Sequence, residues 1–462
     1  MASPETQPLP LGDFKPSDQW QTHVNAIFYG IKGPEIHHHF QTYVSLDYRL
    51  SHALADDFFR RIRETGPPEG PLHVQEWGVG NGNLAARFLT RLKEIDTGQS
   101  VYPRIRYTLC DYSEEILNGV RANPELQKHE GRFFPVRVNA EGKDEFQPHS
   151  VHHIISNEIW DDLSTKVLLK NEGMLYEEYL QPLLARNVPS IPWEPFVVHF
   201  TDGDLDALKA NPPFLDRIVW ERSYQRVDIS DWPYDEVIAK HMETLEDEIP
   251  IPVNTGAFKT LERAKYLLAE TSLGYTSMDY GMLSARELNW RGRPYFKLYG
   301  GQYTFMVNFP LIAEVGRAVG FSDVEWQPQH DFVAANLSEK VVSALELVQL
   351  HPKITRLEPW DADLLMLQTL QALNSVYRSP YPGKLAYPAM PGTPKKQRKQ
   401  IAQLAKSLSA TGVPDTVAYV TESEVAESAG RLKKLGYGER DLKNAFDLTS
   451  QPIVFGHMTL RS

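Results

Sequence analysis

The chain has 462 residues, a length that predicts roughly two or three domains rather than one small core. Its formal net charge of −12 argues against nucleic acid as a partner, because nucleic-acid-binding surfaces are rich in lysine and arginine. The single cysteine, Cys110, excludes a disulfide within the chain, and no apolar run approaches the roughly 20 residues of a membrane-spanning helix. The first residues lack the pattern of a signal or transit peptide, so we expect a cytoplasmic protein.

Residues 1–70 are expected to form a helical lead-in and lid. Residues 1–30 are polar and contain prolines, which predicts a loose segment. Residues 40–63 carry large apolar side chains at helical spacing and predict a helix. A break rich in glycine and proline at residues 66–71 ends this region.

Strand and helix patterns alternate from residue 71 to about residue 160. Strands are predicted at residues 72–76, 105–110, 133–138 and 151–156, with helices after the first two. This alternation predicts an α/β domain over residues 71–340, with a mostly parallel sheet and helices on both faces. Ligands of such sheets bind beyond the carboxyl ends of the strands. Four polar residues stand at predicted strand ends: Glu76, Asp111, Asn139 and Asn157.

An insertion over the ligand-binding edge is expected at about residues 166–255. A hairpin turning at Asn171-Glu-Gly173 would begin it, and residues 192–200 and 218–227 are predicted as further strands. The remaining elements before residue 340 are helices at residues 261–268 and 310–319 and a strand that runs into Asp279-Tyr-Gly281.

The region 341–462 is expected to be mainly helical. After a proline-rich break at residues 378–394, one helix is predicted around Ile401 to Leu408. Another would begin with the capping box Thr421-x-x-Glu424 and end at Gly436, and residues 452–460 predict a final strand.

The most informative motif lies between the first strand and its helix. Glu76 ends the strand, and Gly78, Gly80 and Gly82 follow at alternate positions. Glycines in such a turn let the backbone approach a small ligand closely. In a dinucleotide site the turn faces a pyrophosphate, which the Glu76 carboxylate would repel. The acid favours a ligand with a cationic end, such as S-adenosylmethionine with its ammonium and sulfonium groups.

Asp111, at the end of the second strand, is the candidate ligand of the ribose hydroxyls. Asn139 and Ala140 follow the third strand and are expected near the adenine. Two alternatives remain open at this point. One is a purely structural glycine turn, with Asp111 capping the helix that begins at Ser113. The other is a nicotinamide site, although the glycine spacing is not Gly-x-Gly-x-x-Gly.

A group of polar residues follows the fourth strand: Asn157, Glu158, Asp161 and Asp162. If a helix begins here, the three acids fall on one face. Clustered carboxylates raise one another's pKa, hold a cationic substrate and can take a proton from the nucleophile as it is methylated. We therefore predict Asn157 beside the cofactor and Glu158 and Asp161 as catalytic residues. The alternative is that acids in a first helical turn complement the helix dipole.

Taken together, the motifs resemble those of the MidA-like methyltransferases, a class I S-adenosylmethionine-dependent family with a Rossmann-like fold. The segments that carry the resemblance are Glu76-Trp-Gly-Val-Gly-Asn-Gly82, Asp111-Tyr-Ser113, Asn157-Glu-Ile-Trp-Asp-Asp-Leu-Ser164, Asp279-Tyr-Gly281 and Val307-Asn-Phe309, within residues 35 to 335. The resemblance implies S-adenosylmethionine as cofactor, with Tyr112 in its site. Because mitochondrial members methylate protein arginine during complex I assembly, it also implies arginine as the first choice of acceptor.

The chain departs from the family pattern on the substrate side. Ser164 stands in place of a proline, and His39, Ser45 and Asn308 stand in place of acids. These departures leave open a catalytically silent binding or assembly factor. The expected partner is a protein or small-molecule methyl acceptor, with a homodimer possible. No metal is expected, because the three histidines at residues 37–39 cannot all face one ion in regular structure.

Overall fold

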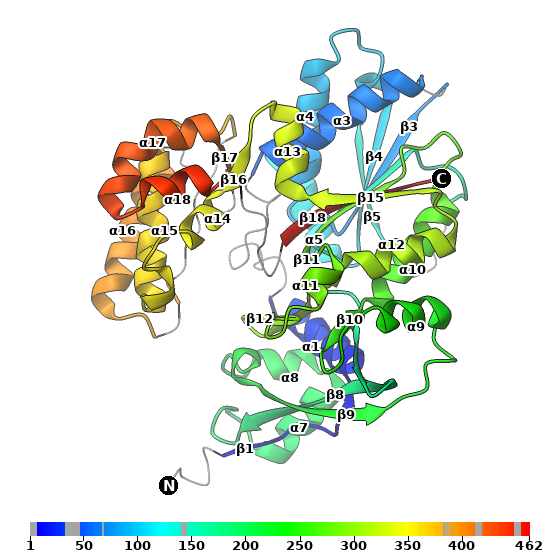
Figure 1. Ribbon diagram of the computed structural model, residues 1–462, viewed down its shortest axis with the longest axis vertical. Helices are drawn as coiled ribbons and strands as arrows, with labels where there is room; N and C mark the ends of the chain where they lie inside the picture. Colours follow the sequence, from blue (N-terminus) through cyan, green and yellow to red (C-terminus); the bar gives the residue numbers. More distant parts are fainter. Residues whose placement is uncertain are drawn as a thin grey trace. The chain divides into compact units, whose positions relative to one another are not determined.

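The computed structural model describes residues 7–32, 47–66, 69–138, 140, 146–381, 385, 387, 389–390, 392–411, 418–447 and 454–462. The chain divides into two compact units (Figure 1). The first unit consists of residues 1–34, 138–327 and 452–462, and the second of residues 35–137 and 328–451. Each unit contains parallel strands together with helices, so the predicted α/β fold with a mainly parallel central sheet is confirmed. The domain boundaries expected near residues 70 and 340 remain predictions.

Three parallel strands of the second unit carry the glycine turn. They lie in the order β3 (Leu72–Trp77), β4 (Ile105–Asp111) and β5 (Phe133–Arg137), which confirms the strands predicted there. The helices around them are α3 (Arg49–Thr65), α4 (Asn83–Ile95), α5 (Glu114–Arg121) and α6 (Pro124–Gln127). Phe88 of α4 contacts Phe58 of α3 and Tyr107 of β4, with ring centroids 5.5 Å apart in both pairs. These contacts hold the helices against the strands.

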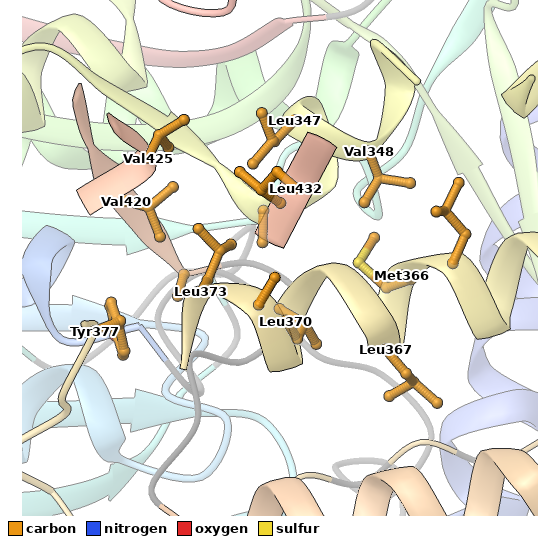
Figure 2. Packing of buried hydrophobic residues seen from close by; sticks show 14 of the residues in the cluster. Leu347, Val348, Met366, Leu367, Leu370, Leu373, Tyr377, Val420, Val425 and Leu432 are labelled. Carbon is orange, nitrogen blue, oxygen red and sulfur yellow. The ribbon is translucent and has the colours of Figure 1, made fainter. Parts of the chain in front are cut away.

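The rest of the second unit is mainly helical and has its own apolar core. Its elements are α13 (Gln329–Leu337), β16 (Val341–Ser343), α14 (Ala344–Gln349), α15 (Pro359–Leu373), α16 (Lys395–Thr411), β17 (Tyr419–Thr421), α17 (Glu422–Leu435) and α18 (Glu439–Asn444). Figure 2 shows how Leu370 and Leu373 of α15 pack with Val420, Val425 and Leu432. The two helices predicted in this region are confirmed as α16 and α17.

The first unit has its own group of parallel and antiparallel strands around β11 (Tyr275–Met282). β6 (His153–Asn157) runs parallel to β11, which also pairs with the short parallel strand β14 (Val307–Asn308). The last strand, β18 (Val454–Arg461), pairs with β11 in the antiparallel direction from Tyr275↔Leu460 to Gly281↔Val454. β15 (Asp323–Pro328) follows β18 in the sheet order, and α10 (Thr255–Leu267) and α12 (Phe309–Val319) complete this part.

A separate six-stranded sheet lies in the first unit and takes four of its strands from residues 166–255, where an insertion is predicted. Its strands are β1 (Pro8–Pro10), β2 (Lys15–Pro16), β7 (Lys166–Asn171), β8 (Met174–Ala185), β9 (Val219–Arg226) and β10 (Ile251–Val253). Further helices of the first unit are α1 (Ser17–Lys32), α7 (Trp193–Asp202), α8 (Leu205–Lys209), α9 (Asp235–Glu243) and α11 (Ala285–Leu288). A two-stranded hairpin, β12 (Phe296–Tyr299) and β13 (Gln302–Phe305), follows α11.

Two local predictions were wrong. Residues 17–32 form the helix α1 rather than a loose segment, because Trp20, Val24 and Ile27 recur at helical spacing and are buried. Residues 193–202 form the helix α7 rather than a strand, and Phe196 and Phe200 bury one face of it. The helix predicted at residues 40–63 begins at Arg49 as described, and residues 40–46 lie outside the described part of the chain.

Candidate active site

The glycine turn has the backbone conformation for which glycine is suited. Gly78, Gly80 and Gly82 have φ angles of 73°, 53° and 75°, in the left-handed region that other residues rarely adopt. The Gly82 amide donates to the Val79 carbonyl at 2.9 Å and closes the turn. A Cβ atom on Gly82 would also lie 2.7 Å from a methyl group of Leu126. The turn therefore needs its glycines for backbone angle and, at Gly82, for space.

Glu76 is a buried acid at the end of β3. Its side chain is 3% exposed, and its Oε2 accepts a hydrogen bond from the Tyr107 hydroxyl at 2.9 Å. Burial raises its pKa to about 8, and repulsion from the Asp111 carboxylate contributes to this increase. Without a cation nearby, Glu76 therefore holds a proton at neutral pH.

Asp111 links the end of β4 to the glycine turn. Its carboxylate accepts hydrogen bonds from the backbone amides of Val79, Tyr112 and Ser113, the last at 2.9 Å. Burial nevertheless raises its pKa to about 6. Ser113, not Asp111, caps α5, because its hydroxyl accepts from the Ile116 amide. The structural alternative in which Asp111 caps this helix is therefore wrong.

The other residues predicted to bind the cofactor after β4 and β5 are less buried than Glu76 and Asp111, or lie outside the described residues. Tyr112 is 48% exposed, and its carbonyl accepts from the Arg137 guanidinium at 3.0 Å. Ala140 lies in a turn and is half-buried. Asn139 lies outside the described residues.

The donor set of the second unit is chemically suited to a cationic ligand. Two neighbouring buried carboxyl groups, Glu76 and Asp111, raise the cost of ionisation, which a positive group would relieve. A pyrophosphate at this turn would have the opposite effect. These residues therefore fit the ammonium end and ribose hydroxyls of S-adenosylmethionine.

The polar residues after β6 lie in a series of turns. Asn157 ends β6, Glu158 has a φ of 50°, and the predicted helix does not form. The reason is that the Asp279 carboxylate accepts from the backbone amides of Trp160 and Asp161, at 2.9 and 3.2 Å, and fixes a turn instead. The expectation that a helix face brings the acids together is therefore wrong.

Asp161 is the most constrained of these acids. Its Oδ2 accepts from the Tyr280 hydroxyl at 2.5 Å, whereas its buried Oδ1 has no partner among the described residues. Burial, together with repulsion from Asp279 and Asp162, raises its pKa well above the usual range. Once it is ionised, a buried carboxyl group with one oxygen available and a raised pKa is a stronger proton acceptor than an ordinary carboxylate.

Asn157 and Glu158 lie beside each other at the end of β6. The Asn157 amide donates to Glu158 Oε1 at 3.3 Å, and its buried Oδ1 has no partner among the residues that the structure describes. The Glu158 backbone amide donates to the Met278 carbonyl of β11 at 2.7 Å. The first unit thus brings Asn157, Glu158 and Asp161 to neighbouring turns.

Asp162 has a different environment and is not a site candidate. Its carboxylate accepts from Asn25 of α1 at 2.5 Å and from Gln302 of β13 at 3.0 Å. A carboxylate with these partners ties α1 to the hairpin and has a structural role. This structural role explains why an acid, Asp162, follows directly after Asp161 in the sequence.

The motif Asp279-Tyr-Gly281 contributes residues that were not predicted for the site. The structure places Asp279 and Tyr280 against Asp161. A Cβ atom on Gly281 would lie 2.0 Å from the Val307 carbonyl oxygen, so glycine is required where β14 approaches β11. The sequence could have identified Asp279 and Tyr280 as site candidates, because both stand near the carboxyl end of a predicted strand, where ligands of such sheets bind.

One departure from the family pattern has a structural explanation. Asn308, which stands in place of an acid, caps α12 by accepting from the Leu311 amide at 3.2 Å. Its amide nitrogen lies 3.2 Å from His241 Nε2. Asparagine can therefore replace the acid without leaving the helix end uncapped. Ser45 and the three histidines at residues 37–39 lie outside the described residues.

The described residues contain neither a metal-binding cluster nor a membrane-spanning helix. No group of three or more histidine, cysteine, aspartate or glutamate side chains among them could hold a metal ion. Within the same ranges, no helix has the length and apolar character needed to cross a membrane.

Comparisons with known proteins give one matching family and several similar solved structures. Residues 53–322 match the model of a family described as "Putative S-adenosyl-L-methionine-dependent methyltransferase". No curated protein matches the sequence. A Burkholderia thailandensis protein described as a "likely methyl transferase" bound to S-adenosyl-homocysteine is similar at 14% identity, with a TM-score of 0.45, over 79% of this chain and 84% of that one. A Haemonchus contortus N-methyltransferase in complex with phosphomonomethylethanolamine is similar at 11% identity, with a TM-score of 0.30, over 78% and 50%.

Proposed function

Because the chain belongs to this family of S-adenosylmethionine-dependent methyltransferases, we propose that it transfers the methyl group directly to a protein side chain or a small molecule. Arginine is the first choice of acceptor. The observation that carries the proposal is the pair of buried carboxyl groups, Glu76 and Asp111, at the glycine turn. Their chemistry suits a ligand that is cationic at one end and carries ribose hydroxyls.

We assign each cofactor-binding residue a role. Glu76 holds the ammonium end, Gly78, Gly80 and Gly82 admit the ligand to the backbone, and Asp111 accepts from the ribose. We assign Tyr112, Asn139 and Ala140 to recognition of the adenine, and Asn157 to the reacting methyl group. S-adenosylmethionine, when bound, supplies a methyl carbon that its sulfonium group already activates.

The acids of the first unit act on the acceptor. Glu158 holds the cationic acceptor group, and Asp161 takes the proton that the acceptor nitrogen loses. The protein also aligns the reacting atoms and excludes water, which supplies much of the rate enhancement in a direct displacement. A nucleophilic triad is not required.

Calorimetric titration with S-adenosylmethionine tests cofactor binding. Wild-type protein is expected to bind, and Asp111→Ala is expected to bind at least tenfold more weakly because the ribose contact is lost, at about 1.4 kcal/mol per factor of ten. Asp331→Ala is the matched control, since Asp331 is an acid of the same unit with a 59% exposed side chain. Absence of binding at millimolar cofactor, or equal affinity in Asp111→Ala, would refute the assignment.

The substrate-side departures favour one alternative, a methyltransferase fold that binds partners without transferring methyl groups. Incubation of a deletion-strain lysate with radiolabelled cofactor distinguishes the two. A labelled species that appears with the wild type and is lost with Glu158→Ala supports transfer. Cofactor binding without any labelled species supports the silent alternative.

Two finer assignments belong to the same proposal. We place the chain with the MidA-like members of its family, on the segments that begin at Glu76, Asn157 and Asp279. We also place it in the cytoplasm. Cell fractionation followed by detection with an antibody tests the location, and recovery in a membrane or organelle fraction would contradict it.

A further inference from the structure

Tyr280 lies at the centre of a buried hydrogen-bonded group in the first unit. Its hydroxyl donates to Asp161 Oδ2 at 2.5 Å and lies 2.9 Å from Thr304 Oγ1 of β13. The side chain is 6% exposed. The two contacts fix the hydroxyl between the turn that carries Asp161 and the hairpin.

Asp161 is also held through its backbone. Its carbonyl oxygen accepts from the Phe305 amide of β13 at 2.9 Å and from the Gln21 side chain of α1 at 3.1 Å. Its amide donates to Asp279. The backbone is therefore fixed from three elements, and the Tyr280 hydroxyl is the group that fixes the carboxylate.

The charge state of Asp161 depends on its neighbours. Burial and repulsion from Glu158 raise the pKa of the Asp279 carboxyl well above its usual range, although the backbone amides of Trp160, Asp161 and Tyr280 donate to it and favour its ionised form. Ionisation of Asp279 also disfavours a charge on Asp161. The ionisable groups around Asp161 are Asp162 and Glu158 in the turns, Asp279 and Tyr280 of β11 and Tyr299 of β12.

We propose that Tyr280 is a positioning residue of the transfer site: its hydroxyl holds the Asp161 carboxylate so that Oδ1 can accept the proton of the methyl acceptor. This inference rests on the proposed function. As the acceptor nitrogen forms its bond to the methyl carbon, the sulfur–carbon bond breaks and its electron pair stays on sulfur. The proton of the nitrogen passes to Asp161 Oδ1 and later to solvent.

The chain offers a matched control on the same strand. Tyr275 is also buried in β11, but its hydroxyl contacts Ser156 Oγ at 2.9 Å rather than a carboxylate. Each of the two Tyr→Phe substitutions therefore removes a buried hydroxyl group. Only Tyr280→Phe removes a hydrogen-bond donor to Asp161.

Titration of the aspartate carboxyl carbons by NMR in the cofactor-free protein is the first readout, with Asp161→Asn to assign the signal. Because the tyrosine donates to the ionised carboxylate, its loss makes ionisation harder. Asp161 is therefore expected to titrate at higher pH in Tyr280→Phe and at the wild-type pH in Tyr275→Phe. Fluorotyrosine at position 280 keeps the shape and strengthens the donor, so it is expected to shift the titration to lower pH.

Transfer kinetics give the second readout. In Tyr280→Phe we expect kcat to fall at least tenfold, the acid limb of the rate profile to move to higher pH, and cofactor affinity to stay unchanged. Equal titrations in the two phenylalanine variants, or equal kcat values, would overturn the inference while the wild type still transfers methyl groups. Absence of transfer by the wild type would overturn the proposed function and the inference with it.

Discussion

At the scale of single residues, Glu76 gives the clearest physical argument for the proposed cofactor site. A carboxyl group buried at the end of β3, with Asp111 nearby, is costly to ionise. Nothing in a purely structural turn requires an acid there. The predicted cofactor, S-adenosylmethionine, is confirmed by the family. A cationic ligand end beside Glu76 would lower the free-energy cost of ionising this buried acid.

Glu76 makes the cofactor-free protein less stable as pH rises. Its pKa in the folded state is about 8, above the usual value for glutamate. Its contribution is therefore fully present below the unfolded-state pKa and is lost as pH rises toward 8, at about 1.4 kcal/mol for each pKa unit. Glu76→Gln cannot ionise, so we expect its free energy of unfolding to fall less between pH 5 and 8 than that of the wild type.

Urea denaturation of the cofactor-free protein at several pH values measures this difference. Glu114→Gln is the control, because Glu114 has a 47% exposed side chain and pairs with Arg121 on the surface of the same unit. Asp111, whose pKa rises to about 6 in the folded state, also lowers the free energy of unfolding as pH rises. Both variants keep Asp111, so this fall is present in each of them. Parallel pH profiles for Glu76→Gln and the wild type would show that Glu76 is ionised throughout.

At the scale of elements, the ends of α17 were predicted from the local sequence. α17 begins at Thr421, whose side chain and that of Glu424 form the capping box, and it ends at Gly436 with a φ of 107°. Both ends were predicted, because the interactions that form them lie within a few residues. Thr421→Ala is expected to lower the free energy of unfolding by about 1 kcal/mol, through the loss of the cap.

Denaturant unfolding monitored by circular dichroism measures this loss. Ser407→Ala is a suitable comparison, since Ser407 lies within α16 rather than at its end. An unchanged midpoint in Thr421→Ala, relative to the wild type, would mean that the cap contributes nothing to the stability of α17.

The elements that could not be predicted depend on distant partners. α1 is helical because the face that carries Trp20 is buried, and Lys15 and Pro16 just before it pair with β8. In the same way, Asp279 fixes the turn at Asp161 from 118 residues away. Local pattern shows which residues are polar and where strands end, but it does not show which strand will lie beside them.

At the scale of the whole molecule, the chain returns to the first unit at its last strand. β18 pairs with β11, the strand that carries Asp279 and Tyr280, after the helical elements of the second unit. Sequence analysis predicted the strand but not its partner. The stability of the proposed transfer site is therefore coupled to residues near the end of the chain.

Gly456 tests this coupling. A Cβ atom there would lie 2.6 Å from Phe309 and 2.7 Å from Leu283, so Gly456→Ala is expected to cost about 1–3 kcal/mol of unfolding free energy. Gly430 of α17 has nothing within 4 Å of such an atom, and Gly430→Ala is expected to stabilise by roughly 0.5–1 kcal/mol. Thermal unfolding of both variants checks the opposite signs, and a stabilising Gly456→Ala would contradict the packing of β18.

The most direct test of the central claim is detection of methyl transfer itself. Protein and radiolabelled S-adenosylmethionine are added to a lysate of a strain that lacks the gene, and labelled species are separated and identified by mass spectrometry. We predict a species labelled by the wild type, absent with Asp111→Ala and with Glu158→Ala, and present with Asp331→Ala. Cofactor binding without any labelled product, or labelling that persists in Asp111→Ala and Glu158→Ala, would contradict the account.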